Sequence, residues 1–147
     1  MNRIKPMVYQ KDRKMEILHI WEYKGYRYFV LNLGTHPTAY IEIPEGHKLF
    51  GKNYNEIYDM GYDIDVHGGL TYSDDNLMCV KSKSWFIGWD YAHCDDYTGY
   101  YEEDFLKHLS EMRKLKKWTT EEIIEECKRA IEQIKEIEEN DEISNKS

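Results

Sequence analysis

The feature that most constrains the fold of this chain is an amphipathic stretch near its C-terminus. Thr119 and Glu122 have the spacing of a capping box, in which each side chain binds the other residue's backbone N–H at the first turn of a helix. Apolar residues then recur at steps of three and four, the period of one helical face. This stripe comprises Ile123, Cys127, Ala130, Ile131, Ile134 and Ile137. The pattern predicts a long helix that packs either on the rest of the chain or on a second copy of itself.

The segments before this helix alternate between strand patterns and turn signals. Residues 26–33 are rich in aromatic and branched side chains, and residues 38–44 alternate apolar and polar side chains after a Gly-Thr-His-Pro turn. Residues 62–73 have the pattern of a strand interrupted by a Gly-Gly pair, and residues 84–93 that of a further strand. Residues 102–115 can form a short helix, and residues 52–60 form either a short helix or an irregular loop.

These patterns predict one α+β domain over residues 1–140, followed by a disordered tail at 141–147. We expect an antiparallel sheet of about four or five strands, packed by the C-terminal amphipathic helix and one or two short helices. A length of 147 residues with 41% apolar side chains suits a single hydrophobic core.

Charge and cysteine content exclude several classes of protein. The net charge is −8, and an acidic body repels nucleic acid, so we expect no direct nucleic-acid binding. The acidity fits either ordinary solubility or a surface that meets a basic partner. Cys79, Cys94 and Cys127 form no CxxC pair, which argues against a disulfide framework or a structural zinc site. No stretch is long and apolar enough for a membrane span, and the N-terminus lacks a secretory signal, so we expect a cytoplasmic protein.

Histidines gather beside turn signals in the middle of the chain, where loops at one end of a sheet can converge. They are His36, His47, His67 and His93. Imidazole and carboxylate groups together suit a divalent metal or an acid–base pair, which suggests a metal-dependent hydrolase. Such an enzyme would use His67, His93, Asp90 and Asp96. The alternative is that each histidine only binds a nearby backbone group.

The Gly68-Gly69 pair and the strand at 84–93 suggest a ligand pocket. Paired glycines can expose backbone N–H groups to an anion, or can simply form the corner of a hairpin. The strand alternates, so that Trp89 shares one face with Tyr91, while Gly88 leaves space beside Asp90 on the other face. A carboxylate beside such a gap could receive a polar ligand; alternatively, these aromatic rings form the core.

Three strings resemble, in this order, a family of small uncharacterised proteins encoded mainly by bacteriophages and prophages. The strings are "YIEIPEGHKLFGKNY", "DIDVHGGLTYS" and "WFIGWDYAHCDD", followed by the "KKWTTEEIIEE" helix. The sequence departs from this family at Tyr91, where the family has a cysteine. The resemblance implies a phage accessory protein, a class that often counteracts host defence by binding a defence protein or by trapping its nucleotide signal.

The leading prediction is therefore a non-enzymatic phage accessory protein of the host bacterial cytoplasm, with no cofactor, no metal ligand and no membrane contact. It would bind a host defence protein or sequester a small nucleotide-like ligand. The predicted ligand-binding residues are His67, Gly68, Gly69, Thr71, Trp89, Asp90 and His93. Two alternatives stay open: the metal-dependent hydrolase, and a structural or assembly protein that forms a homo-oligomer through the C-terminal helix.

Overall fold

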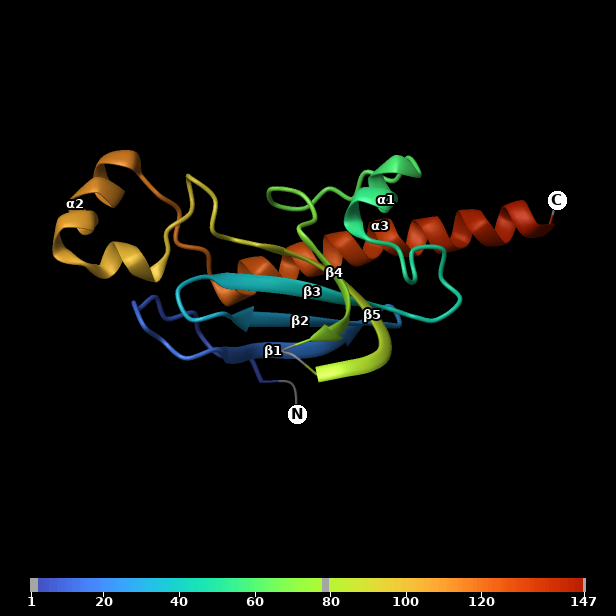
Figure 1. The fold of residues 1–147 in the computed structure, drawn as a ribbon, viewed down its shortest axis with the longest axis horizontal. Helices are drawn as coiled ribbons and strands as arrows, with labels where there is room; N and C mark the ends of the chain where they lie inside the picture. Colours follow the sequence, from blue (N-terminus) through green and yellow to red (C-terminus); the bar gives the residue numbers. More distant parts are fainter. Residues whose placement is uncertain (1–2, 78–79, 147) are drawn as a thin grey trace.

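The computed structural model describes residues 3–77 and 80–146 and contains one five-stranded antiparallel sheet in the order β1-β2-β3-β5-β4 (Figure 1). The strands are β1 (Glu16–Tyr23), β2 (Tyr26–Asn32), β3 (Pro37–Ile43), β4 (Tyr72–Leu77) and β5 (Val80–Asp90). The helical segments are α1 (Tyr54–Asp59), the 3-10 turn η1 (Gly99–Glu102), α2 (Asp104–Arg113) and α3 (Thr120–Lys146). This architecture confirms the predicted α+β fold.

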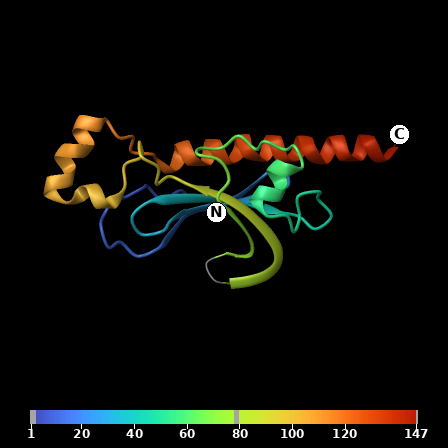
Figure 2. The same cartoon turned by 45° about the horizontal axis from the view of Figure 1, so that its top comes forward.

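Helix α3 lies along one face of the sheet for most of its length (Figures 1 and 2). All six residues of the predicted stripe are buried against the strands, which confirms packing within the chain. The capping box is also present, because the Glu122 N–H donates to Thr119 Oγ1 at 3.2 Å and the Thr119 N–H donates to Glu122 Oε1 at 3.0 Å. Because the apolar stripe is covered by the chain's own sheet, it is not open to a second copy.

The helix continues to Lys146, through most of the segment 141–147 for which the sequence predicts a disordered tail. Ion pairs between side chains one turn apart lie just before this segment, since Lys135 Nζ lies 3.9 Å from Glu138 Oε2 and 4.0 Å from Glu139 Oε1. Asp141 lies 3.6 Å from Lys48 Nζ, which ties this end of the helix to the loop after β3.

The other face of the sheet is partly covered by the β4–β5 hairpin, which curls away from α3 (Figure 2). A second apolar cluster fills this curl and includes Phe29, Tyr40 and Phe86. Gly88 pairs with Tyr40 across the strands, and a Cβ at Gly88 would lie 2.6 Å from Tyr40 Cδ1. The space that the sequence predicts beside Asp90 is therefore taken up by the Tyr40 ring.

Residues 62–71 are buried at alternating positions but do not form the predicted strand. Ile64 and Val66 point into the core, yet the backbone at Asp65 and His67 bonds side chains of α3 and not a neighbouring strand. The Asp65 N–H donates to Gln133 Oε1 at 2.7 Å, and Gln133 Nε2 donates to the Asp65 carbonyl at 3.0 Å. Alternating apolar side chains indicate that one face of the segment is buried. Here side chains of α3 bond the backbone groups that a neighbouring strand would otherwise bond.

The structure also adds β1, which the sequence analysis did not predict, and it divides residues 99–113 between η1 and α2. Among the described residues, no helix has the length and apolar character that crossing a bilayer requires. Cys94 and Cys127 are free thiols, and Cys79 lies outside the described residues.

Candidate functional site

The turn that contains Gly68 and Gly69 lies against the loop that follows β5. This contact brings His67, before the turn, close to His93, after the strand. The Gly69 N–H donates to the Val66 carbonyl at 2.9 Å and closes a turn in which Gly68 has φ +70°. The His93 ring packs directly on Gly68, since a Cβ there would lie 2.2 Å from His93 Nε2. The missing side chain of Gly68 thus makes room for His93, which follows β5 by three residues.

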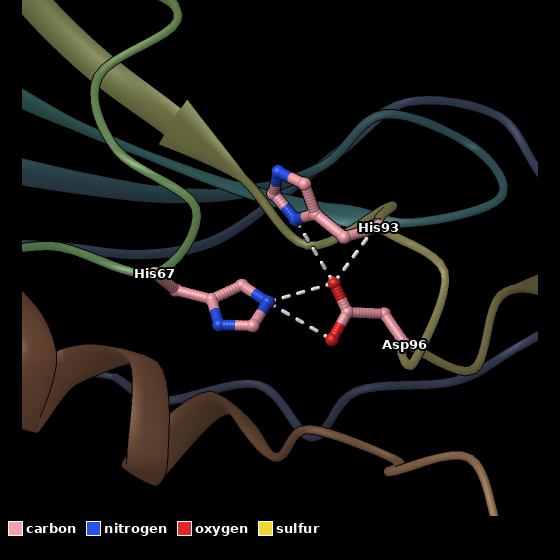
Figure 3. A group of neighbouring side chains, drawn as sticks. All are labelled: His67, His93 and Asp96. Atoms are coloured by element: carbon pink, nitrogen blue, oxygen red, sulfur yellow. Dashed lines mark hydrogen bonds and ion pairs between the residues drawn. The ribbon is translucent and has the colours of Figure 1, made fainter.

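Asp96 is the centre of the site, and both imidazoles point toward its carboxylate (Figure 3). His67 Nε2 lies 2.9 Å from Asp96 Oδ1 and 2.8 Å from Oδ2. The His93 backbone N–H donates to Oδ2 at 2.9 Å, and His93 Nδ1 lies 3.2 Å from the same oxygen. Two imidazoles from separate segments therefore share one carboxylate.

The surroundings of Asp96 keep it ionised. Its side chain is only 2% exposed, and burial by itself raises the pKa of a carboxyl group. Hydrogen bonds from the His93 N–H, from His67 and from Trp118 outweigh that effect and hold the pKa of Asp96 below its ordinary value. Trp118 contributes its indole N–H, which donates to Oδ1 at 2.9 Å.

A second carboxylate, Glu126 of α3, contacts the backbone of His67. It accepts hydrogen bonds from the His67 backbone N–H at 3.3 Å, from Trp89 Nε1 at 3.1 Å and from the Tyr91 hydroxyl. The Tyr91 ring stacks on His67 with a centroid separation of 5.0 Å and an interplanar angle of 6°. Burial, together with the Glu126 bond, raises the pKa of Tyr91, so this hydroxyl remains a donor. The His67 ring is therefore held by Asp96 at its Nε2 edge and by Tyr91 stacked on its plane.

The remaining predicted site residues occupy different positions around this cluster. Trp89 is 1% exposed, so its ring belongs to the core beneath the site and has no face open to a stacking ligand. Thr71 Oγ1 donates to Asp90 Oδ2 at 3.2 Å. Asp90 Oδ1 lies 3.8 Å from His93 Nε2, at the side of the ring remote from Asp96. A Cβ at Gly69 would meet a different neighbour, the Tyr58 hydroxyl, at 3.3 Å.

The other two histidines of the predicted group lie outside the cluster. His47 is buried, and its Nε2 lies 3.0 Å from the Ile134 carbonyl, which is the structural role that the alternative interpretation assigned. His36 is half-buried, and burial lowers its pKa.

A cleft of about 540 Å³ opens beside the cluster, and His93 and Asp96 form part of its lining. His36 and Cys94 line the same cleft, and α2 contributes Arg113. A larger hollow of about 700 Å³ lies along the N-terminal segment, but its lining contains no histidine, and its Arg13 is already paired with Glu16 at 2.8 Å. Of these two hollows, the smaller cleft is therefore the one lined by residues of the His67–His93–Asp96 cluster.

Sequence reasoning did not single out Trp118, Glu126 or Arg113. Trp118 directly precedes the capping box, and Glu126 borders the buried stripe of α3, so both carry a signal for helix structure only. Their approach to His67 depends on how α3 docks on the sheet.

No family model, curated protein or solved structure matches the chain. The function is therefore inferred from the geometry of the site. Two imidazoles and an ionised carboxylate can together coordinate a cation, or the carboxylate can orient an imidazole as a base.

Proposed function

We propose that the protein acts by binding a small, anionic, nucleotide-like ligand in the cleft between the loop after β5 and α2. The observation that supports this proposal most directly is the position of Arg113. Its side chain is exposed, lines the cleft, and forms no ion pair within the described part of the chain. An unpaired guanidinium in a cleft that His93 also lines suits a phosphate group, which it can bind through two parallel hydrogen bonds.

The rest of the cleft can accommodate the less polar part of such a ligand. Tyr100 and Tyr101 line it, and the Tyr100 side chain is 55% exposed, so its ring is accessible for stacking on a base. Leu106 and Leu109 of α2 form an apolar wall. Because burial lowers its pKa, His36 is neutral at pH 7 and offers a hydrogen bond without adding charge. Aromatic, apolar and cationic groups together are the usual composition of a small-ligand pocket.

In the cell, this binding would make the protein an accessory factor that sequesters a nucleotide signal. The resemblance of its motifs to phage proteins supports such a role, in which a phage product counteracts a defence system in the host bacterial cytoplasm. A resemblance supplies context without a mechanism, so the proposal depends on the cleft itself. A host defence protein as the partner is the competing outcome of the experiment below.

The experiment is calorimetric titration of the protein with adenosine monophosphate and with adenosine, in the presence of a metal chelator. We expect the monophosphate to bind more tightly, because only it carries the phosphate for Arg113. Arg113→Ala should weaken monophosphate binding by about tenfold to a hundredfold, the usual effect of losing a hydrogen bond to a charged group. Arg27→Ala is the matched control, because it removes the same charge from β2, outside the cleft.

Equal binding of the two compounds, or an Arg113→Ala variant that binds normally, would overturn the proposal. If neither compound binds, the proposal is overturned and a host defence protein becomes the favoured partner. In a separate incubation, made without chelator and with added Zn²⁺, the nucleotide is recovered and weighed by mass spectrometry. Intact monophosphate supports sequestration, whereas recovery of adenosine would establish the hydrolase alternative.

A further inference from the structure

The His67–His93–Asp96 cluster lies beside the cleft, but the proposed anion binding by Arg113 does not depend on it. One ring nitrogen of His67, one ring nitrogen of His93 and a carboxylate oxygen of Asp96 all lie within 4.8 Å of one another. The groups come from two separate segments, the glycine turn and the loop after β5, so the tertiary fold brings them together (Figure 3). We propose that these three side chains bind a divalent transition-metal ion of the zinc type.

The ligand set suits that class of ion. Two imidazole nitrogens and one carboxylate oxygen are typical ligands of Zn²⁺ and of neighbouring first-row metals, whereas Mg²⁺ and Ca²⁺ prefer oxygen ligands throughout. In the structure, His67 Nε2 faces both carboxylate oxygens, at 2.8 and 2.9 Å. A cation can take the place of the proton between this nitrogen and the carboxylate, and so bind both His67 and Asp96. His93 Nδ1 can then serve as the third ligand.

The charges around the cluster favour a cation. Asp96 is buried, and Glu126, which accepts a hydrogen bond from the His67 backbone N–H, has only 13% of its side chain exposed. Within the described residues, no Lys or Arg side chain lies within ion-pair distance of Asp96, and Glu126 has only Arg129, at 3.7 Å. A buried carboxylate is costly without a positive partner. A divalent ion between the imidazoles supplies that charge.

Contacts behind the ligands hold them in position, as established metal sites require. The Trp118 indole and the His93 backbone N–H both donate to Asp96, which fixes the carboxylate. Tyr91 stacks on one face of His67, and Gly68 leaves the space that the His93 ring fills. Such surrounding contacts set ligand orientation and affinity. Three protein ligands leave a coordination position open, as in catalytic sites.

The open position links the metal to ligand binding in the cleft. His93 and Asp96 both line the cleft, so a phosphate oxygen held by Arg113 could complete the coordination. This step alone rests on the proposed function, whereas the metal site itself does not. The two are separated experimentally, because the nucleotide titration is made in chelator and the metal titration is made without nucleotide.

The test uses chelator-treated, dialysed full-length protein titrated with Co²⁺ alone, followed by visible absorption and by quenching of tryptophan fluorescence. We expect one ion per chain, with the intense absorption of a low-coordinate Co²⁺ site, and its displacement by Zn²⁺. Quenching is expected because the Trp118 ring lies 4.9 Å from the His67 ring. His67→Ala and His93→Ala should each weaken Co²⁺ binding by at least about a hundredfold, and Trp118→Phe by about tenfold to a hundredfold.

The matched control is His108→Ala, which removes an exposed histidine of α2 that does not belong to the cluster. It should bind Co²⁺ as the wild-type protein does. Co²⁺ that binds with no low-coordinate spectrum, or that is lost equally in His108→Ala, would overturn the proposal.

A second measurement needs no variant and so does not depend on the variants folding. Diethyl pyrocarbonate modifies accessible imidazoles, and peptide mass spectrometry locates the modified residues. Zn²⁺ should protect His67 and His93 in the wild-type protein while leaving His108 reactive. Equal modification of His67 and His93 with and without Zn²⁺ would refute the metal site.

Discussion

Gly68 has two roles that no other residue type can fill together. Its φ of +70° lies in the left-handed region that favours glycine, and the place of its side chain is taken by the His93 ring. Gly61 shares only the first property, with φ +92° and no atom within 4 Å of the place that a Cβ would occupy. Comparing Gly68 with Gly61 therefore separates the effect of positive φ from the effect of the contact with His93.

We predict that Gly68→Ala destabilises the protein more than Gly61→Ala does. Each change should cost about 1 kcal/mol or more for alanine at positive φ, and Gly68→Ala must in addition displace the His93 ring. The measurement is the midpoint of thermal unfolding, with the His93 imidazole signals followed by NMR. Equal midpoints together with unshifted His93 signals would show that the ring does not depend on Gly68.

At the residue scale, sequence reasoning found one half of the site and missed the other. His67 and His93 stand beside turn signals, and turns at one end of a sheet converge, so their meeting could be anticipated. Trp118 and Glu126 reach the site only because α3 docks across the sheet at one particular angle and register. That docking is set by many apolar contacts at once and has no local signature around either residue.

At the element scale, α3 was predicted most fully because its signals are local. The capping box and the three- and four-residue steps lie within the helix itself. Strands β2 and β3 were predicted for the same reason, since a turn signal joins two aromatic and branched segments. The segment 62–71 was predicted wrongly as a strand because its apolar alternation is compatible with any extended backbone, and only the position of Gln133 shows which partner it has.

The start of α3 provides a test of pH dependence. Burial alone would raise the pKa of Glu122, but hydrogen bonds from Lys116 and from Thr119 outweigh it and lower the pKa below the ordinary value of 4.5. A carboxylate whose pKa is lower in the folded state stabilises that state above the unfolded pKa. This stabilisation is complete at pH 7 and disappears as the pH falls below 4.5, through the folded-state pKa.

We therefore predict that Glu122→Gln lowers the thermal midpoint at pH 7 and that its midpoint approaches the wild-type value as the solution is acidified. Thermal unfolding followed by circular dichroism across this pH range measures both effects. Glu136→Gln is the control, because Glu136 is exposed on the same helix and forms no ion pair among the described residues. A constant difference between Glu122→Gln and wild type at every pH would contradict the role assigned to the carboxylate.

At the scale of the whole molecule, a strongly acidic protein has an exposed arginine, Arg113, in the cleft that we propose binds an anion. The net charge is −8, and several surface lysines and arginines are already paired, as in Lys24 with Glu132 and Arg27 with Glu42. The overall field repels anions at long range, while Arg113 attracts them only locally. Since salt at about 0.1 M screens exposed charges beyond roughly 10 Å, the local attraction decides the binding of a small ligand.

A polyanion is repelled more strongly than a small ligand, because its charges extend far beyond the cleft and over the acidic surface. We predict that single-stranded DNA of about 20 nucleotides neither binds the protein nor displaces adenosine monophosphate, even at about 50 mM salt, where basic nucleic-acid-binding proteins bind most tightly. Fluorescence anisotropy of a labelled oligonucleotide measures the first outcome, and competition calorimetry measures the second. Arg113→Ala should leave the oligonucleotide result unchanged. Displacement of the monophosphate by the oligonucleotide would mean that Arg113 belongs to an extended nucleic-acid surface, and the cleft would then serve a polymer instead of a free nucleotide.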